Sequence, residues 1–302
     1  MPDQPERSLT RTANAVPPQA WFAVSAVFHY LGPALAVLLF PVVGVLGVAW
    51  FRIASAALIL APITKLWRTF RRADTRERVL LLTLGACLAV MNAAFYLALD
   101  RLPIALVAAI EFIGTIGLAL WGLRSWRNYA ALALAVLGVA LLIDMPSLLT
   151  AGGSALTADL LGLAWAGLNG GMFVLYIVLG YRISWGGASG GVERLGAAMA
   201  AAFLFVTPIG LLQALAAFQM PMLVLAGIGV GICSSVIPYI CDQLAMSRLP
   251  RASFALLLAL LPATATVIGI VVLRQIPGLA DLAGIALVMV GVACHQSAQT
   301  DA

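Results

Sequence analysis

Charged residues are scarce in this sequence, and so are the side chains that carry enzyme chemistry. Asp, Glu, Lys and Arg together make up 10% of the 302 residues, and only two residues are histidine. Hydrophobic residues make up 63%, and the mean hydropathy is +1.06. A globular interior cannot remove that much apolar surface from water. The composition therefore excludes a soluble enzyme, a disordered scaffold and a secreted disulfide module, and it indicates that lipid surrounds most of the chain.

The sequence also lacks the motifs of metal sites and of nucleotide binding. It contains neither a zinc-binding HExxH motif nor a Walker A motif. Its four cysteines fall in apolar stretches without zinc-type spacing and are interpreted as small buried hydrophobes: Cys87, Cys233, Cys241 and Cys294. We expect no catalytic residue, no metal and no cofactor. Without an ATP-binding module, any transport must draw on an existing gradient.

Ten apolar segments are close to the length that a membrane span requires. A helix needs about 20 apolar residues to cross the hydrocarbon layer. The segments cover residues 21–40, 44–63, 79–99, 102–122, 128–145, 160–180, 195–216, 222–246, 252–273 and 278–295. The fifth and the tenth are the shortest. The pattern predicts an all-α polytopic membrane protein with ten transmembrane helices.

Basic residues are concentrated in alternate loops, which predicts the orientation of the chain. Of the 17 basic residues, those in the N-terminal tail and in every second loop share one side: Arg7, Arg11, Lys65, Arg68, Arg71, Arg72, Arg76, Arg78, Arg124, Arg127, Arg182, Arg194, Arg248 and Arg251. Only Arg101 and Arg274 fall on the other side, and Arg52 lies within a span. Short cytoplasmic loops carry such an excess. We therefore expect both termini in the cytoplasm, and the net charge of +5 indicates these loops rather than nucleic-acid binding.

Two sequence segments recur at corresponding places in the two halves of the chain. Tyr96–Pro103 and Gln243–Pro250 share an Arg-Leu-Pro corner, and Ala133–Ala140 is echoed by Ala286–Ala293. Because five is odd, the second half must enter the membrane from the opposite side. The predicted units are a cytoplasmic tail (1–20), a first five-helix repeat (21–145), an external linker (146–159), a second, inverted repeat (160–295) and a cytoplasmic tail (296–302). Inverted repeats are typical of secondary transporters, whose site lies between the halves.

Three ionisable residues fall near the middle of predicted spans: His29, Arg52 and Glu111. A charge at the centre of a membrane helix costs about 2.5–3.5 kcal/mol on insertion scales, so such residues face the interior and are functional by default. The alternative is that Arg52 and Glu111 only neutralise each other. His29 is equally compatible with a hydrogen-bonded interior residue and with a proton carrier. Asn92 and Asn169 add mid-span polar groups that either bond between helices or line a site.

Prolines and glycines mark further positions within the spans. A proline inside a helix frees the carbonyl four residues before it, and at membrane depth such a carbonyl is tolerated only within protein or beside a cavity. Pro33 frees the carbonyl of His29, Pro238 frees that of Ser234, and Pro262 frees that of Leu258. Because all three prolines fall near the midplane of the membrane, the pattern favours a cavity over ordinary helix kinking. Two GxxxG spacings, Gly167–Gly171 and Gly227–Gly231, indicate close helix packing.

Several short motifs fall in the order of a known family. They are Phe40–Gly44, Met91-Asn92 with Phe95-Tyr96-Leu97, Ala109–Gly114, Pro238-Tyr239 and Arg248–Pro250. Over roughly residues 21–295 the chain resembles the EamA-type drug/metabolite transporter superfamily, and more narrowly its bacterial threonine/homoserine exporter branch. The resemblance implies ten helices in two inverted halves, a location in the bacterial inner membrane, and efflux of small metabolites in exchange for protons.

The leading prediction is a secondary active exporter of small, threonine- or homoserine-like amino acids or related metabolites, working by proton antiport with alternating access. The proposed roles are Glu111 for the substrate ammonium, Arg52 for its carboxylate, Asn92 and Asn169 for a hydroxyl, and Glu111 and His29 for proton coupling. If Arg52 and Glu111 form a locked pair, the site must use the Asn groups and freed carbonyls instead. The alternative is efflux of cationic drugs or uncharged metabolites by the same fold, and a membrane-embedded enzyme is disfavoured.

Overall fold

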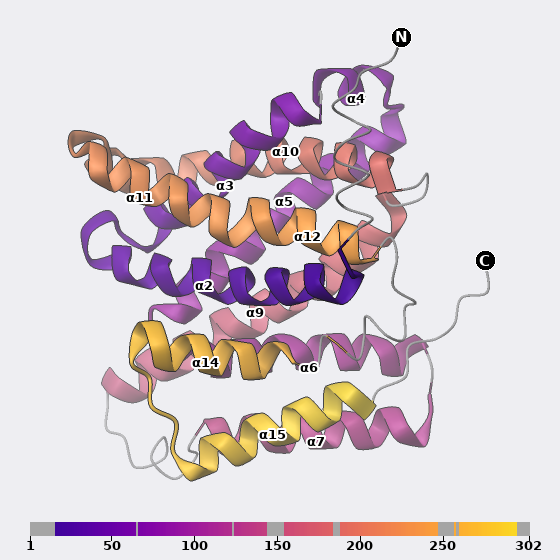
Figure 1. Cartoon of the computed structure of the whole chain (residues 1–302), viewed down its shortest axis with the longest axis vertical. Helices are drawn as coiled ribbons and strands as arrows, with labels where there is room; N and C mark the ends of the chain where they lie inside the picture. The colour runs from indigo at the N-terminus through magenta and orange to yellow at the C-terminus, as the bar shows by residue number, and fades with distance from the viewer. Residues whose placement is uncertain are drawn as a thin grey trace.

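The computed structural model describes residues 16–64, 66–122, 124–143, 154–183, 188–246, 257 and 260–294. Within these residues all regular structure is helical, as Figure 1 shows. Of the predicted units, residues 1–15 of the N-terminal tail, the whole C-terminal tail and much of the external linker lie outside the described residues, and so do Lys65, Arg248 and Arg251.

The helices follow the order of the predicted segments. The first half contains α2 (Pro18–Val43), α3 (Val45–Ile63), the short α4 (Leu66–Arg72), α5 (Thr75–Leu99), α6 (Ile104–Gly122) and α7 (Trp126–Leu142). The second half contains α9 (Ser154–Ile183), α10 (Ala188–Ala214), α11 (Pro221–Gly231), α12 (Ile237–Met246), α14 (Leu261–Leu273) and α15 (Leu279–Cys294). A 3-10 helix, η1 (Leu215–Gln219), extends α10, and a π-helix, η2 (Ile232–Val236), joins α11 to α12.

By length and composition, 6 of the described helices can cross a membrane. Their apolar parts are Pro18–Val43, Val45–Ile63, Thr75–Leu99, Leu160–Gly180, Glu193–Gln219 and Pro221–Asp242. The shorter apolar helices are Ile104–Leu118, Trp126–Leu142, Leu261–Leu273 and Leu279–Cys294. The all-helical membrane architecture predicted from composition is confirmed. The shorter helices match the remaining four predicted segments in order along the chain.

Several helix starts differ from the sequence prediction, and α10 begins at Ala188, seven residues before its predicted segment. Helix α9 begins at Ser154, so the end of the predicted linker is helical. A hydropathy window detects only the apolar part of a helix, and α9 extends beyond that part at both ends. Helix α14 begins at Leu261, with Pro262 in its first turn. Proline suits that position because a first-turn N–H has no partner within the helix anyway.

Helices from the two halves pack in corresponding pairs. Helix α7 packs along α15 and α3 along α10, while α5 packs on α9 as α2 packs on α12. Figure 1 shows α7 and α15 side by side at one edge of the bundle. At their crossing, a Cβ on Gly138 would lie 2.5 Å from the carbonyl oxygen of Gly284, so only glycine permits this approach.

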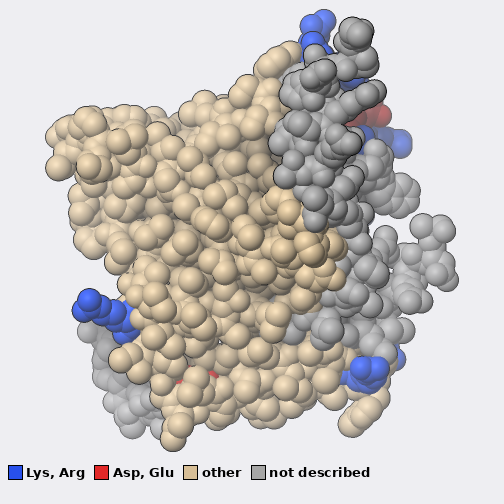
Figure 2. All heavy atoms as spheres, in the orientation of Figure 1, with Lys and Arg blue, Asp and Glu red and all other residues tan. Residues whose placement is uncertain are grey.

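The surface of the bundle matches a lipid environment. Figure 2 shows Lys and Arg near the left and right edges of the visible face, with a broad and almost uncharged area between them. Large apolar side chains are exposed on the helices, including Leu212 on α10, Leu225 on α11 and Val271 on α14, which are 78%, 63% and 72% exposed. In water such exposure would be unfavourable. In a lipid bilayer, such side chains form the expected outer face of the protein.

Two glutamines hold the beginnings of the helices that carry the candidate charges. The side-chain oxygen of Gln213, on α10, accepts hydrogen bonds from Leu46 N at 3.0 Å and Gly47 N at 3.1 Å, at the start of α3. Gln275 likewise accepts from Ile104 N at 3.2 Å, at the start of α6. The first N–H groups of a helix have no partner within it. The glutamine contacts therefore fix α3 and α6 relative to the second half.

Candidate functional site

Arg52 is buried on α3 and held by the π-helix η2. Its Nε donates to the hydroxyl of Ser235 at 3.1 Å, and its Nη2 donates to the carbonyl of Ser234 at 3.1 Å. Its side chain is only 4% exposed. The guanidinium carbon also lies 5.3 Å from the ring centre of Tyr96 and 5.9 Å from that of Phe95, within cation–π range. Neutral groups therefore surround this cation.

Two features of the structure converge on Ser234 in the π-helix. Pro238 has no N–H, so it cannot bond the carbonyl of Ser234, which accepts from Arg52 instead. Gly32 of α2 presses against the same turn, since a Cβ there would lie 2.5 Å from the backbone nitrogen of Ser234. On the other side, a Cβ at Gly231 would lie 2.5 Å from that of Ser55 on α3. The carbonyl of Ser234, which Pro238 was predicted to free, is thus part of the Arg52 site.

Glu111 is buried on α6 and bonded to an amide. Asn169 on α9 donates from Nδ2 to Glu111 Oε2 at 3.1 Å, and the two side chains are 8% and 2% exposed. Close contact between α6 and α9 positions this bond, because a Cβ at Gly114 would lie 3.1 Å from the carbonyl oxygen of Gly170. The structure therefore brings together Glu111 and Asn169, two of the residues predicted to form the site.

Arg52 and Glu111 are neighbours without being an ion pair. They interact electrostatically, but no contact within 4.0 Å joins them; the ion pair found among the described residues is Arg194 with Glu77, at one end of the bundle. Tyr239 on α12 interacts electrostatically with both charges. The locked pair that the sequence left open is not formed here. Each charge instead belongs to one polar centre and has its own neutral partners.

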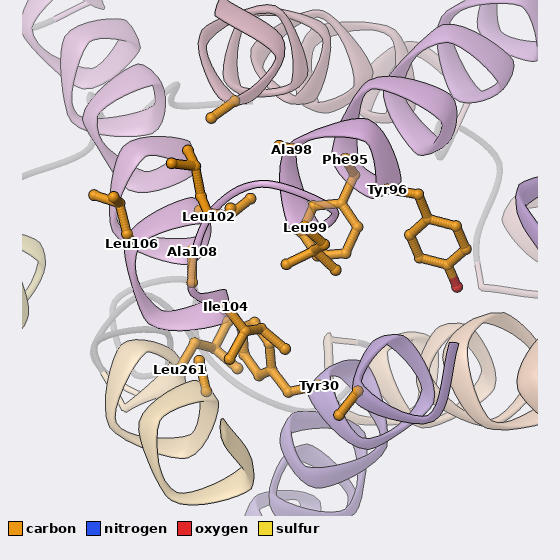
Figure 3. Packing of buried hydrophobic residues seen from close by; sticks show 14 of the residues in the cluster. Tyr30, Phe95, Tyr96, Ala98, Leu99, Leu102, Ile104, Leu106, Ala108 and Leu261 are labelled. Atoms are coloured by element: carbon orange, nitrogen blue, oxygen red, sulfur yellow. The ribbon is translucent and has the colours of Figure 1, made fainter. Parts of the chain in front are cut away.

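Two buried polar atoms in this centre have no hydrogen-bond partner within the described part of the chain. They are Nη1 of Arg52 and the hydroxyl of Tyr96. The Tyr96 side chain is fully buried and lies beside Arg52 and Ser234. Figure 3 shows Phe95 and Tyr96 leaving α5 in different directions, and Tyr30 of α2 lying beside Ile104 and Leu261. Nearly all buried polar groups in folded proteins are paired, so each unpaired atom here requires an explanation.

The contacts of the other two predicted residues, His29 and Asn92, give less direct support for a substrate role. His29 is half-buried on α2, contacts Tyr30 edge-on with ring centres 5.4 Å apart, and interacts electrostatically with Arg52. Asn92 is buried but donates to the carbonyl of Leu88 in its own helix at 2.7 Å, so its role toward a substrate stays a prediction.

The remaining prolines do not join the polar centre in the same way as Pro238. Pro33 lies inside α2, directly after Gly32. Pro262 lies in the first turn of α14, and the carbonyl of Leu258 lies outside the described residues. A cavity of ≈ 280 Å³ lies between α6, α14 and α15, lined in part by Thr266 and Gln275 and by neither Arg52 nor Glu111. With 4% and 8% of their surfaces exposed, Arg52 and Glu111 are buried away from this cavity.

Tyr96 and Ser235 belong to the site but were not among the predicted site residues. Tyr96 follows Asn92 by one helical turn, so a shared face with a mid-span amide was a usable signal. Asp242 is a further partly buried acid, on α12 beside the hydroxyl of Ser25. Within the described residues, no group of three His, Cys, Asp or Glu side chains is arranged to hold a metal ion.

Comparison with known proteins gives sequence relatives and a shared fold. The threonine/homoserine exporter RhtA of Escherichia coli (strain K12) is 35% identical over 244 residues, which are 81% of this chain and 79% of the relative. The protein of the same name from Salmonella typhimurium (strain LT2) is 33% identical over the same shares of the two chains. One crystal structure matches with a TM-score of 0.53 and 21% identity. The match covers 91% of this chain and 96% of the chain in that structure, and it shows a shared fold alone. No family model matches the chain.

Proposed function

The chain belongs to the threonine/homoserine exporter family, within the EamA-type drug/metabolite transporters, and we propose that it exports small amino acids such as threonine and homoserine by proton antiport. It is a multi-pass membrane transporter and not an enzyme. The proposal adds the substrate class, the coupling ion and an alternating-access cycle in the bacterial inner membrane.

One observation carries the substrate proposal: two opposite charges are buried near each other without forming an ion pair. Desolvating a charge is costly unless a partner compensates, and here only neutral groups hold Arg52 and Glu111. A zwitterionic amino acid supplies both missing partners. Its carboxylate binds Arg52 and its ammonium binds Glu111, so each anchor is neutralised only when substrate is present.

The same observation favours an amino acid over the alternative substrates. A cationic drug would complement Glu111 but would place a second positive charge near Arg52, which is already unpaired. An uncharged metabolite would leave both charges uncompensated. Asn169, which donates to one Glu111 oxygen, lies close enough to the ammonium site to contact a substrate hydroxyl in our proposal. Asn92 and His29 remain candidate contacts on the neighbouring helices.

Proton coupling follows from a competition at one carboxylate. Glu111 can hold either a proton or the substrate ammonium, because both require the same oxygens. In the proposed cycle, the substrate displaces the proton on the cytoplasmic side, and a proton displaces the substrate on the external side. His29, which interacts with Arg52, is the second candidate for carrying the proton.

The proposed architecture is ten spans in two inverted five-helix repeats with both termini in the cytoplasm. The corresponding packing of α3 with α10 and α7 with α15 supports it, because each pair joins helices of the same rank in the two halves. In such transporters the two repeats move against each other around a site near the midplane. The site described above draws on α3, α5 and α6 of the first half and on α9 and η2 of the second, as this arrangement requires.

Competition in energised inverted vesicles tests the proposal. Labelled threonine uptake is challenged with threonine, with its amide, which lacks the carboxylate, and with its deaminated acid, which lacks the ammonium. We expect both analogues to compete at least tenfold more weakly than threonine, because each leaves one buried anchor unpaired. Equal competition by all three would refute the two-anchor site. Stimulation of uptake by an organic cation gradient alone would favour the drug-efflux alternative.

A further inference from the structure

We propose that Nη1 of Arg52 and the hydroxyl of Tyr96 together form the carboxylate subsite of the transport pathway. The proposal rests on amino-acid export as the function and adds Tyr96 as a residue that determines specificity. Its starting point is that, among the described residues, these two buried side-chain atoms have no hydrogen-bond partner within 3.5 Å, and that the Tyr96 hydroxyl interacts with Arg52 and Ser234. They belong to side chains in direct contact, with the guanidinium carbon 5.3 Å from the centre of the tyrosine ring.

Both unpaired atoms can donate a hydrogen bond, so together they match an acceptor with two oxygens. A guanidinium N–H can only donate, and a phenolic hydroxyl donates readily to an anion. A carboxylate offers two oxygens and one negative charge, which equals the single uncompensated charge of Arg52. A phosphate group would bring more charge and more oxygens than these two donors can satisfy. The subsite therefore fits a carboxylate.

The rest of the Arg52 side chain is fixed, which aims Nη1. Ser235 and the Ser234 carbonyl occupy Nε and Nη2. The turn that supplies them cannot retreat, because Gly32 of α2 packs against the backbone of Ser234. The rings of Tyr96 and Phe95 cover the guanidinium. Such preorganisation lowers the entropy that binding must overcome.

The hydroxyl of Tyr96 has a distinctive energetic signature under this proposal. A buried hydroxyl that stabilises the fold makes a hydrogen bond in the absence of substrate, and its removal destabilises the protein. A buried hydroxyl without a partner does the opposite, because its removal relieves a desolvation cost. The Tyr96→Phe variant should therefore be as stable as the wild type, or more stable, when no substrate is bound. It should nevertheless bind carboxylate substrates less tightly.

The experiment compares Tyr96→Phe with Tyr176→Phe in the full-length protein purified in detergent. Tyr176 is half-buried on α9 and stacks on Phe173 with ring centres 5.9 Å apart, so its variant removes a comparable hydroxyl. Threonine and threonine amide are titrated, and thermal unfolding is recorded without ligand. We expect Kd for threonine to rise about tenfold or more in Tyr96→Phe, as expected for losing a hydrogen bond to a charged group. Affinity for the amide and all properties of Tyr176→Phe should change less than about twofold.

The outcomes separate this inference from the function on which it rests. If the wild type binds threonine tightly and Tyr96→Phe binds it equally well, the subsite is refuted while amino-acid export stands. A ligand-free Tyr96→Phe protein that unfolds earlier and loses both ligands equally also refutes it, because the hydroxyl is then structural. If the wild type binds neither threonine nor homoserine, the proposed function fails, and the subsite fails with it.

Discussion

Replacing Gly32 by alanine tests whether the contact between α2 and the π-helix holds Arg52 in place. The added Cβ would lie 2.5 Å from the backbone nitrogen of Ser234 and 2.6 Å from its Cα. Normal contacts of this kind are roughly 1 Å longer, and neither atom belongs to a flexible side chain. The two helices must therefore separate, or the π-helix must shift, and the Ser234 carbonyl then moves relative to Arg52.

The magnitude follows from two opposing effects. Overpacking a tight contact costs typically about 1–3 kcal/mol. Alanine gains about 0.8–1.0 kcal/mol over glycine in a helix interior, which offsets part of that cost. We expect a net loss of up to about 2 kcal/mol in the free energy of unfolding. In chains of this size that lowers the melting temperature by roughly 2 °C for each kcal/mol.

The assay is thermal unfolding of the purified variant, together with threonine binding. Gly167→Ala is the matched control, because no described atom outside its own helix lies within 4 Å of a Cβ at Gly167 on α9. The control should be unchanged or slightly more stable, with normal binding, whereas Gly32→Ala should lose both stability and threonine affinity. Equal behaviour of the two variants would refute the idea that this contact positions Arg52.

Three further predictions concern coupling, the carboxylate anchor and topology. Glu111→Gln should insert normally and keep the bond from Asn169 but lose pH-gradient-driven export, measured in inverted vesicles; wild-type-like driven export would remove Glu111 from the coupling mechanism. Arg52→Lys should weaken threonine binding about tenfold while affecting threonine amide less, because a lysine ammonium cannot replace the planar guanidinium; equal loss for both ligands in a binding titration would contradict this. Cysteines at positions 101 and 274 should react with an impermeant thiol reagent in intact cells lacking the native cysteines, whereas one at position 72 should not; the reverse pattern would invert the topology.

The helical architecture was predictable because lipid leaves the backbone few alternatives. A chain crossing hydrocarbon must satisfy its N–H and C=O groups internally, so each long apolar segment becomes a helix. Burial of Arg52 and Glu111 was predictable for a related reason, since an ionisable group in lipid is too costly to face outward. These conclusions depend on local sequence and on the solvent, which a single sequence reveals.

The pairing of side chains was not predictable, because it depends on how separate helices are rotated against each other. Nothing in the sequence indicates that Glu111 meets Asn169, or that Arg52 meets the turn before Pro238. The two GxxxG spacings make the same point. Gly227 and Gly231 pack closely on Phe51 and Ser55 of α3, whereas a Cβ at Gly167 or Gly171 would meet no described atom within 4 Å. The same GxxxG spacing thus forms a tight helix interface in one case and an open helix face in the other.

The arrangement of the two charges has a consequence for the energy of transport. A zwitterion that binds between Arg52 and Glu111 compensates both charges and carries no net charge through the membrane. Under the proposed antiport with one proton per amino acid, each cycle moves one positive charge inward. Such a movement is driven by about 2.3 kcal/mol for each 100 mV of membrane potential, negative inside. An Arg52–Glu111 ion pair would be more stable without substrate, but substrate would then have to break it. In our proposal, because the charges are kept apart, each on neutral partners, substrate binding itself is the step that neutralises the site.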